Sequence, residues 1–170
     1  MTKLRISNVS FHPDGVEIFF PTSKTDQNGR GEVVFVGRIA ASKYCPALCL
    51  KAYTLRLQWE AFECDAFPFA GPLFPAFRQA GGRSHPTTRP FSRQAATKAF
   101  RDVLGSLGVP DPTLYTLHSG RRVGATAAAM NGCSFLSIKR QGRWRSDSCP
   151  QRYIDDANAR INNFSRFLGL

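Results

Sequence analysis

Three side chains within residues 118–144 have the chemistry and the spacing to bind a phosphate. His118 and Arg121 lie three residues apart where we expect a helix to begin, so both face one side of it near the positive end of its dipole. N–H donors and positive charge at such a place suit an oxyanion, phosphate above all. Trp144 adds an indole N–H within the basic run 142–145, and Tyr153 follows nine residues later.

Each of these residues also has a structural interpretation. A histidine at a helix start is commonly a cap or a surface residue, a tryptophan commonly closes a core, and a single helical tyrosine usually packs. The individual residues therefore do not decide between a site and a scaffold. Their order along the chain carries more information.

A small β-sheet followed by helices is expected to position these side chains. Residues 16–20 and 32–36 are β-branched and aromatic runs on either side of a long polar tip, which is typical of a hairpin, and an earlier strand is expected over residues 6–11. Apolar spacing and caps predict the helices, whereas prolines and glycines predict loops. The expected helices cover residues 46–60, 92–108, 119–130, 134–141 and one starting at 147 or 148, and the expected loops cover 67–75 and 81–90. The fold class is therefore α+β, a mainly helical single domain over residues 1–170 with a small N-terminal antiparallel sheet.

The positive charge is concentrated in two segments. The 170 residues carry a net charge of +11, of which residues 77–101 hold +6 and residues 118–153 another +6, leaving the rest at −1. Clustered Lys and Arg indicate a nucleic-acid partner more than a surface tuned for solubility.

No apolar run approaches the roughly 18 residues of a membrane span. The five cysteines are irregularly spaced and form no CxxC pair, so we expect reduced thiols in a cytoplasmic or nuclear compartment and no metal site, and the N-terminus resembles no secretory signal.

Taken in order, the motifs resemble the catalytic domain of the tyrosine recombinase (phage integrase) family. Residues 23–31, with Lys24, resemble the family's β-hairpin lysine segment, and residues 117–129 its central His-x-x-Arg helix. Residues 138–144, ending in Gly-Arg-Trp, resemble the approach to its histidine-or-tryptophan position. The Gly-Arg-Trp form is similar to the integrases of eukaryotic mobile elements.

The resemblance implies DNA recombination or integration without a metal or cofactor. Tyr153 would attack a phosphodiester to form a 3′-phosphotyrosyl bond, and Lys24 would protonate the leaving 5′ oxygen. Arg121, His118 and Trp144 would hold the nonbridging oxygens. The implied partner is double-stranded DNA, bound by a homo-oligomer, the synaptic tetramer, and not a membrane. The residues expected to contact that DNA are Arg93, Arg122, Lys139, Arg140, Arg143 and Arg145.

One expected residue has no counterpart among these motifs. The family uses a first phosphate-binding arginine in an Arg-x-Ser-Glu-like helix, whereas Arg5 is followed by Ile-Ser-Asn and runs into a strand. We therefore expect Arg5 to match a noncatalytic arginine, the first catalytic arginine to lie upstream of Met1, and no separate N-terminal DNA-clamping domain in this truncated catalytic-like domain. Loss of such an arginine costs about 10² to 10³ in rate, so this chain would bind DNA yet recombine poorly by itself.

Two other functions stay open, with a third less favoured. Residues 127–144 resemble a helix-turn-helix, with Lys139 and Arg140 on its second helix, which would suit a noncatalytic DNA-binding module. The missing first arginine would instead suit an inactive integrase remnant. A generic RNA-binding protein is disfavoured because there is no aromatic RNP-like strand and no Gly-x-x-Gly clamp. The apolar tail 161–170 is expected either to dock on a neighbouring protomer or to pack on its own domain.

Overall fold

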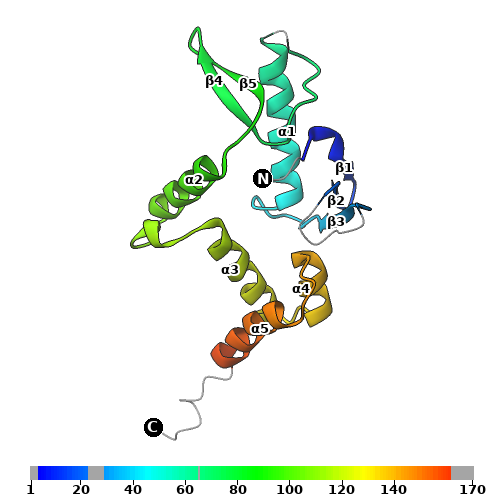
Figure 1. The fold of residues 1–170 in the computed structure, drawn as a ribbon, viewed down its shortest axis with the longest axis vertical. Helices are drawn as coiled ribbons and strands as arrows, with labels where there is room; N and C mark the ends of the chain where they lie inside the picture. The colour runs from blue at the N-terminus through cyan, green and yellow to red at the C-terminus, as the bar shows by residue number, and fades with distance from the viewer. Residues whose placement is uncertain (1–3, 23–28, 65, 162–170) are drawn as a thin grey trace, which may run out of the picture. The chain divides into compact units, whose positions relative to one another are not determined.

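The computed structural model describes residues 4–22, 29–64 and 66–161 (Figure 1). The chain divides into two compact units, Met1–Arg93 and Gln94–Leu170. The single domain expected over residues 1–170 stays a prediction. Mixed α and β structure is confirmed, with the strands in the first unit and helices in both.

The first unit opens with a three-stranded antiparallel sheet. Strands β1 (Val9–His12), β2 (Gly15–Phe20) and β3 (Glu32–Gly37) lie in the order β1-β2-β3. This confirms the predicted hairpin. The first strand begins later than predicted, because a 3-10 turn, η1 (Ile6–Asn8), precedes it and the Asn8 side chain accepts a hydrogen bond from the Arg5 backbone N–H at 2.8 Å.

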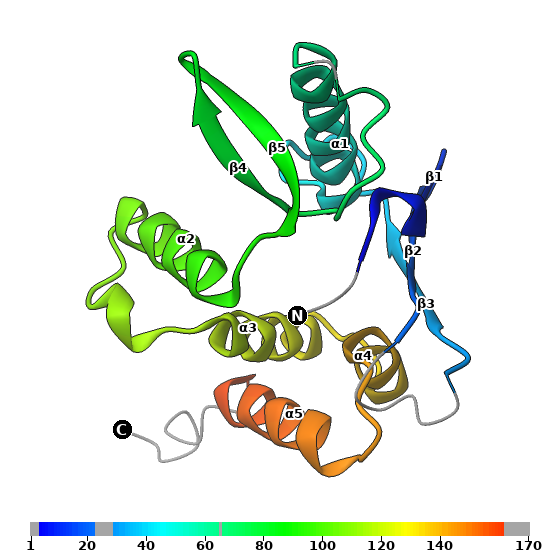
Figure 2. The ribbon, with the colours of Figure 1, turned by 45° about the horizontal axis from the view of Figure 1, so that its top comes forward.

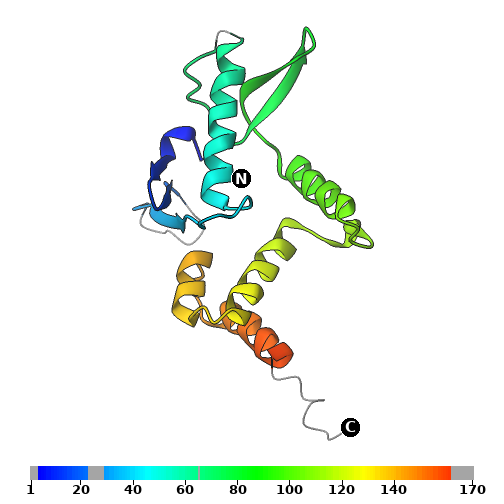
Figure 3. The same ribbon diagram turned by 180° about the vertical axis from the view of Figure 1, so that it is seen from behind.

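Helix α1 (Pro46–Phe62) packs beside this sheet and extends slightly beyond its predicted end. It begins after Cys45, with a proline at its first position. Seen from behind, a two-stranded ribbon lies at the other end of α1 (Figure 3). The ribbon consists of β4 (Pro75–Ala80) and β5 (Arg83–Pro90), and β5 contacts α1.

The loop predicted over residues 81–90 is therefore wrong. Gly81 and Gly82 have φ values of 58° and 76° and join β4 to β5 as a two-residue turn, which is the glycine pair that a tight hairpin favours. Pro86 sits opposite Phe77. Because each strand of a two-stranded ribbon is an edge, a proline need not break the ladder there.

Two clusters form the core of the first unit. Val16, Cys45 and Ala47 join the sheet to the start of α1. Leu57, Ala61 and Phe69 cover the end of α1, where Gln58 clamps the backbone of Phe69 by accepting from its N–H at 2.9 Å and donating to its carbonyl at 3.0 Å. Arg5 donates to the Ala70 carbonyl at 3.3 Å, so its guanidinium helps fasten the N-terminal segment to this loop.

The second unit is helical. It contains most of α2 (Arg93–Ser106), a 3-10 turn η2 (Pro112–Leu114), α3 (Leu117–Met130), α4 (Phe135–Gly142) and α5 (Ser148–Ile161). Figure 2 shows α5 running along α3, with α4 next to both. The helix bounds agree with the predicted ones within a few residues.

Local caps explain where α3 and α4 begin. Thr116 precedes α3 and its backbone N–H donates to the Ser119 hydroxyl at 3.1 Å, and Ser134 accepts a hydrogen bond from the Ser137 N–H at 3.2 Å. Gly132, at a φ of 79°, turns the chain between these helices. Among the described residues, no helix is long and apolar enough to span a bilayer, and no cluster of three or more His, Cys, Asp or Glu could hold a metal.

Candidate active site

The Trp144 ring lies directly on the backbone of Gly142. A β-carbon added at Gly142 would overlap the Cζ3 and Cε3 atoms of the indole. The ring reaches this position because α4 ends at Gly142 and Arg143 then takes a left-handed conformation, with φ 54°. The Gly-Arg-Trp sequence is thus a local structural unit: glycine provides the surface, arginine the turn, and tryptophan folds back.

Arg121 connects α3 to that unit. Its guanidinium carbon lies 4.4 Å from the centroid of the Trp144 ring, a cation–π distance, and its Nη2 donates to the Gly142 carbonyl. An arginine has five N–H donors, and the Arg121 side chain is exposed. It therefore keeps donors for an anion while it is anchored at the end of α4.

Tyr153 also packs against the indole. The two ring centroids are 5.6 Å apart and the planes are tilted by 54°. Tyr153 is only 8% exposed and packs with Ala125 of α3 and Ile138 of α4. Trp144 and Tyr153 therefore also have the packing role expected of a helical tyrosine and a core tryptophan, because both contribute to the core of the second unit. The same packing aligns Arg121, Trp144 and Tyr153 in one contact chain.

His118 lies one turn before Arg121 on α3 and is exposed. Within the part of the chain that the structure describes, its ring makes no hydrogen bond or ion pair. Lys24 lies outside the described residues. Three of the five predicted catalytic residues are therefore in contact, a fourth lies on the same helix, and the position of the fifth is not described.

The residues predicted to contact DNA differ in their surroundings. Lys139 pairs with Asp147, which neutralises much of its charge, and Arg143 is half-buried at the end of α4. The remaining four are exposed: Arg93, which begins α2, Arg122 on α3, Arg140 on α4, and Arg145 in the segment before α5. An anion approaching Arg121 would therefore meet further positive charge on α3 and α4.

An apolar hollow of about 220 Å³ opens beside the contact chain. Arg121 and Trp144 line it together with the small residues Gly124, Ala125 and Ala128 of α3. Sequence reasoning missed these alanines and Gly142 as parts of the site. The alanine-rich composition of α3 and the glycine before Arg-Trp are the signals that could have found them.

Comparison with known proteins gives one significant similarity. The chain is 29% identical over 159 residues to a protein described as an integrase/recombinase xerD homolog from Selenomonas ruminantium. The match covers 93% of this chain and 42% of that protein, so the chain spans about two fifths of the relative's length. No family profile matches the chain, and no solved structure matches it significantly. The similarity supports the tyrosine recombinase family, as the motifs predict.

Proposed function

We propose that this chain carries the catalytic portion of a tyrosine recombinase, an enzyme that cuts and rejoins DNA strands through a 3′-phosphotyrosyl bond. The observation that supports it is the contact chain of Arg121, Trp144 and Tyr153. These residues come from α3, the segment after α4, and α5, and they meet in one place. The similarity to a recombinase over most of the chain supports the same assignment.

The chemistry divides strand exchange into two transfers. The Tyr153 oxygen bonds to phosphorus and releases its proton to solvent as the bond between phosphorus and the 5′ oxygen breaks, and Lys24 supplies a proton to that leaving oxygen. The strand stays attached to the tyrosine through its 3′ phosphate. A 5′ hydroxyl from another strand then reverses the step, so no outside energy source is consumed.

The five-coordinate phosphorus carries extra negative charge, and the site offers fixed donors to it. Arg121 and His118 would bind the nonbridging oxygens, and Trp144 would donate its indole N–H. Because Arg121 is already anchored on Gly142 and on the indole, less side-chain freedom is lost when phosphate binds. Anchoring of this kind is what an oxyanion site requires.

Burial of Tyr153 sets a condition on this mechanism. Only 8% of the Tyr153 surface is exposed. Either the ring must move out of the core to reach the phosphate, or the phosphate must approach the tyrosine hydroxyl at the edge of the Trp144 ring. Exposing an aromatic ring costs about 2 kcal/mol, and bound DNA would have to supply that free energy. If the ring moves, the packed arrangement is the resting one, in which the nucleophile is sheltered.

A nicked duplex tests the proposal directly. On a suicide half-site the short 5′ fragment diffuses away after cleavage, so the covalent protein–DNA adduct accumulates and is visible on a denaturing gel. We expect the adduct with the native chain and with Tyr115→Phe, a matched control in the same unit, and none with Tyr153→Phe. The assay is repeated with an N-terminal extension that carries the expected first arginine. If neither form yields an adduct that depends on Tyr153, the proposal fails.

A noncatalytic DNA-binding module is the second candidate. It is favoured by the four-residue connection 131–134 between α3 and α4, which turns at Gly132 and brings the two helices into contact. This function would need Lys139 and Arg140 but not Tyr153. It would be preferred if Tyr153→Phe preserved every DNA-dependent activity while charge reversal at Lys139 and Arg140 abolished it.

By the same resemblance we propose a synaptic tetramer on DNA and a kinship with the integrases of eukaryotic mobile elements. The kinship is suggested by the Gly-Arg-Trp form alone. Measuring the mass of the protein on a duplex that carries its target site would test the tetramer. Part of the tail 161–170, which bears on assembly, lies outside the described residues.

A further inference from the structure

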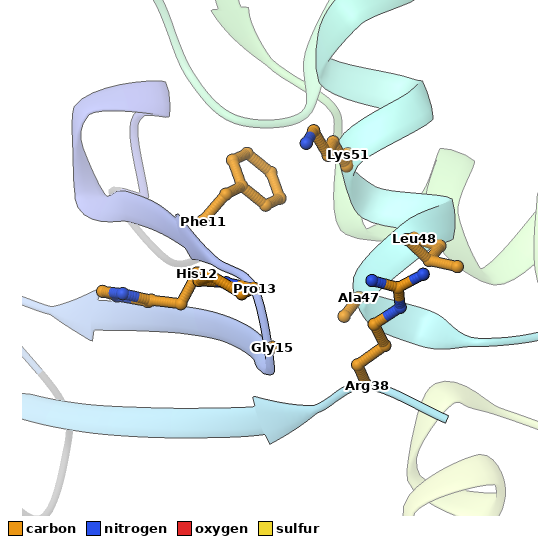
Figure 4. Close-up of a pocket in the computed structure, with 8 residues that line it drawn as sticks. All are labelled: Phe11, His12, Pro13, Gly15, Arg38, Ala47, Leu48 and Lys51. Carbon is orange, nitrogen blue, oxygen red and sulfur yellow. The ribbon is translucent and has the colours of Figure 1, made fainter. Parts of the chain in front are cut away.

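A hollow of about 310 Å³ opens in the first unit, within Met1–Arg93. It is bounded by the turn between β1 and β2, the residue that follows β3, and the first turns of α1 (Figure 4). Of the residues proposed for strand cleavage, none that the structure describes lines it. Its walls combine positive charge, supplied by Arg38 and Lys51, with apolar surface, supplied by Phe11 and Leu48.

Arg38 and Lys51 approach the hollow from two different elements. In Figure 4 the Arg38 guanidinium rises beside Leu48, and the Lys51 amine extends toward the Phe11 ring. Both residues are exposed, and within the described ranges neither side chain pairs with a carboxylate. Two cations held around one concave surface repel each other, and an anion between them removes that repulsion.

The acidic groups nearby do not provide that anion. Glu17 lies 3.5 Å from the His12 imidazole, which points away from the hollow. Asp14 contributes its backbone carbonyl, which accepts a hydrogen bond from the Arg38 N–H at 2.7 Å and holds the end of β3 against the turn. Neither Glu17 nor Asp14 lines the hollow.

The start of α1 strengthens the positive potential there. The pKa of the Cys45 thiol is lowered, first by the hydrogen bond from the Ile39 backbone N–H, 3.2 Å from the sulfur, and also by the N–H groups of Leu48 and Ala47 and by the charge of Arg38. Ala47, Leu48 and Arg38 also line the hollow. The effect on Cys45 is therefore a second sign that this region favours negative charge.

We propose that this hollow binds a phosphate group carried on a nucleoside. Arg38 would bind phosphate oxygens through its planar fork, and Lys51 would add a point charge. The Phe11 ring, 37% exposed, would pack against the attached sugar or base. The phosphate could belong to the backbone of DNA; the site then adds an interaction remote from Tyr153 in sequence, and the inference rests on the proposed function. It could instead belong to a free nucleotide, and the inference is then independent of the proposed function.

The test compares Arg38→Gln/Lys51→Gln with Lys43→Gln/Arg56→Gln, a control in the same unit that removes the same charge from exposed residues outside the hollow. In the DNA arm, the affinity for a fluorescent duplex is measured over a range of salt concentrations, without cleavage. Removing one protein–phosphate interaction reduces the slope of log K against log salt by about 0.9. We expect a reduction of this size in the double variant and the native slope in the control.

In the nucleotide arm, deoxyadenosine monophosphate is added to the native chain while amide NMR shifts are recorded. We expect saturable shifts at Ile39, Ala47 and Leu48 that inorganic phosphate reproduces only weakly. This arm needs no variant, so its result does not depend on whether the double variant folds.

A changed slope assigns the site to DNA, and saturable shifts assign it to a free nucleotide. If the slope of a folded double variant equals that of the control and no saturable shift appears at these amides, the proposal is overturned. The covalent adduct at Tyr153 is measured separately, so either proposal can fail while the other stands.

Discussion

Replacing Gly142 with alanine should destabilise the protein, although the same change usually stabilises a helix. Gly142 is the last residue of α4, and its φ is not in the left-handed region. Helix propensity alone would therefore favour alanine by up to about 1 kcal/mol. The new β-carbon, however, would overlap the Trp144 ring, so the indole has to move.

The cost of moving the indole exceeds the gain in propensity. Overpacking of this kind costs about 1–3 kcal/mol, and displacing the ring from Arg121 removes a cation–π interaction worth roughly 0.5–1 kcal/mol at an exposed site. The net change should be a loss of about 1–3 kcal/mol. If Trp144 is first replaced by alanine, the overlap disappears and Gly142→Ala should become neutral or stabilising by up to about 1 kcal/mol.

The measurement is a double-mutant cycle in which urea unfolding of each variant is monitored by circular dichroism. The destabilisation by Gly142→Ala in the native background should disappear or reverse in the Trp144→Ala background, and equal m-values would show that the two-state treatment applies throughout. In a Trp59→Phe background Trp144 is the sole tryptophan, so its fluorescence reports the displacement directly. A loss of the same size in both backgrounds would refute the proposed packing of the ring on Gly142.

Three further predictions concern packing, the ribbon and the Cys45 thiol. Tyr153→Phe should change the free energy of unfolding by less than about 1 kcal/mol, because the ring stays, whereas Tyr153→Ala should cost about 3–5 kcal/mol; equal urea midpoints for the two would show that the ring is not part of the core. Alanine at Gly81 or Gly82 should cost about 1 kcal/mol each, because both have positive φ values, and the resulting loss should appear as faster hydrogen exchange in β4 and β5. Because the pKa of Cys45 is lowered in the folded chain, its stabilising contribution is complete above the pKa of the unfolded thiol and is lost as pH falls through the folded pKa; the difference in unfolding free energy between the native chain and Cys45→Ala should grow from neutral to alkaline pH, and a flat difference would contradict this.

Much of the helical structure follows from local signals. The capping residues Thr116 and Ser134 and the glycine at 132 act within one turn of the chain, so their effects can be inferred from neighbouring residues. Local signals do not predict the ribbon, because prolines within β5 are typical of loops. Their tolerance depends on each strand being an edge, which is a property of the assembled sheet.

For the candidate site, the amino-acid sequence indicates which residues are reactive or phosphate-binding and, through the spacing of three, that His118 and Arg121 share a face of α3. Only the folded chain brings the Trp144 ring onto Gly142 and within cation–π distance of Arg121, and buries Tyr153 against the same ring. These interactions join three separate segments, and they depend on the left-handed turn at Arg143 and on how α3, α4 and α5 pack. Spacing along one helix is a local property, whereas the approach of distant side chains is set by the core that forms between them.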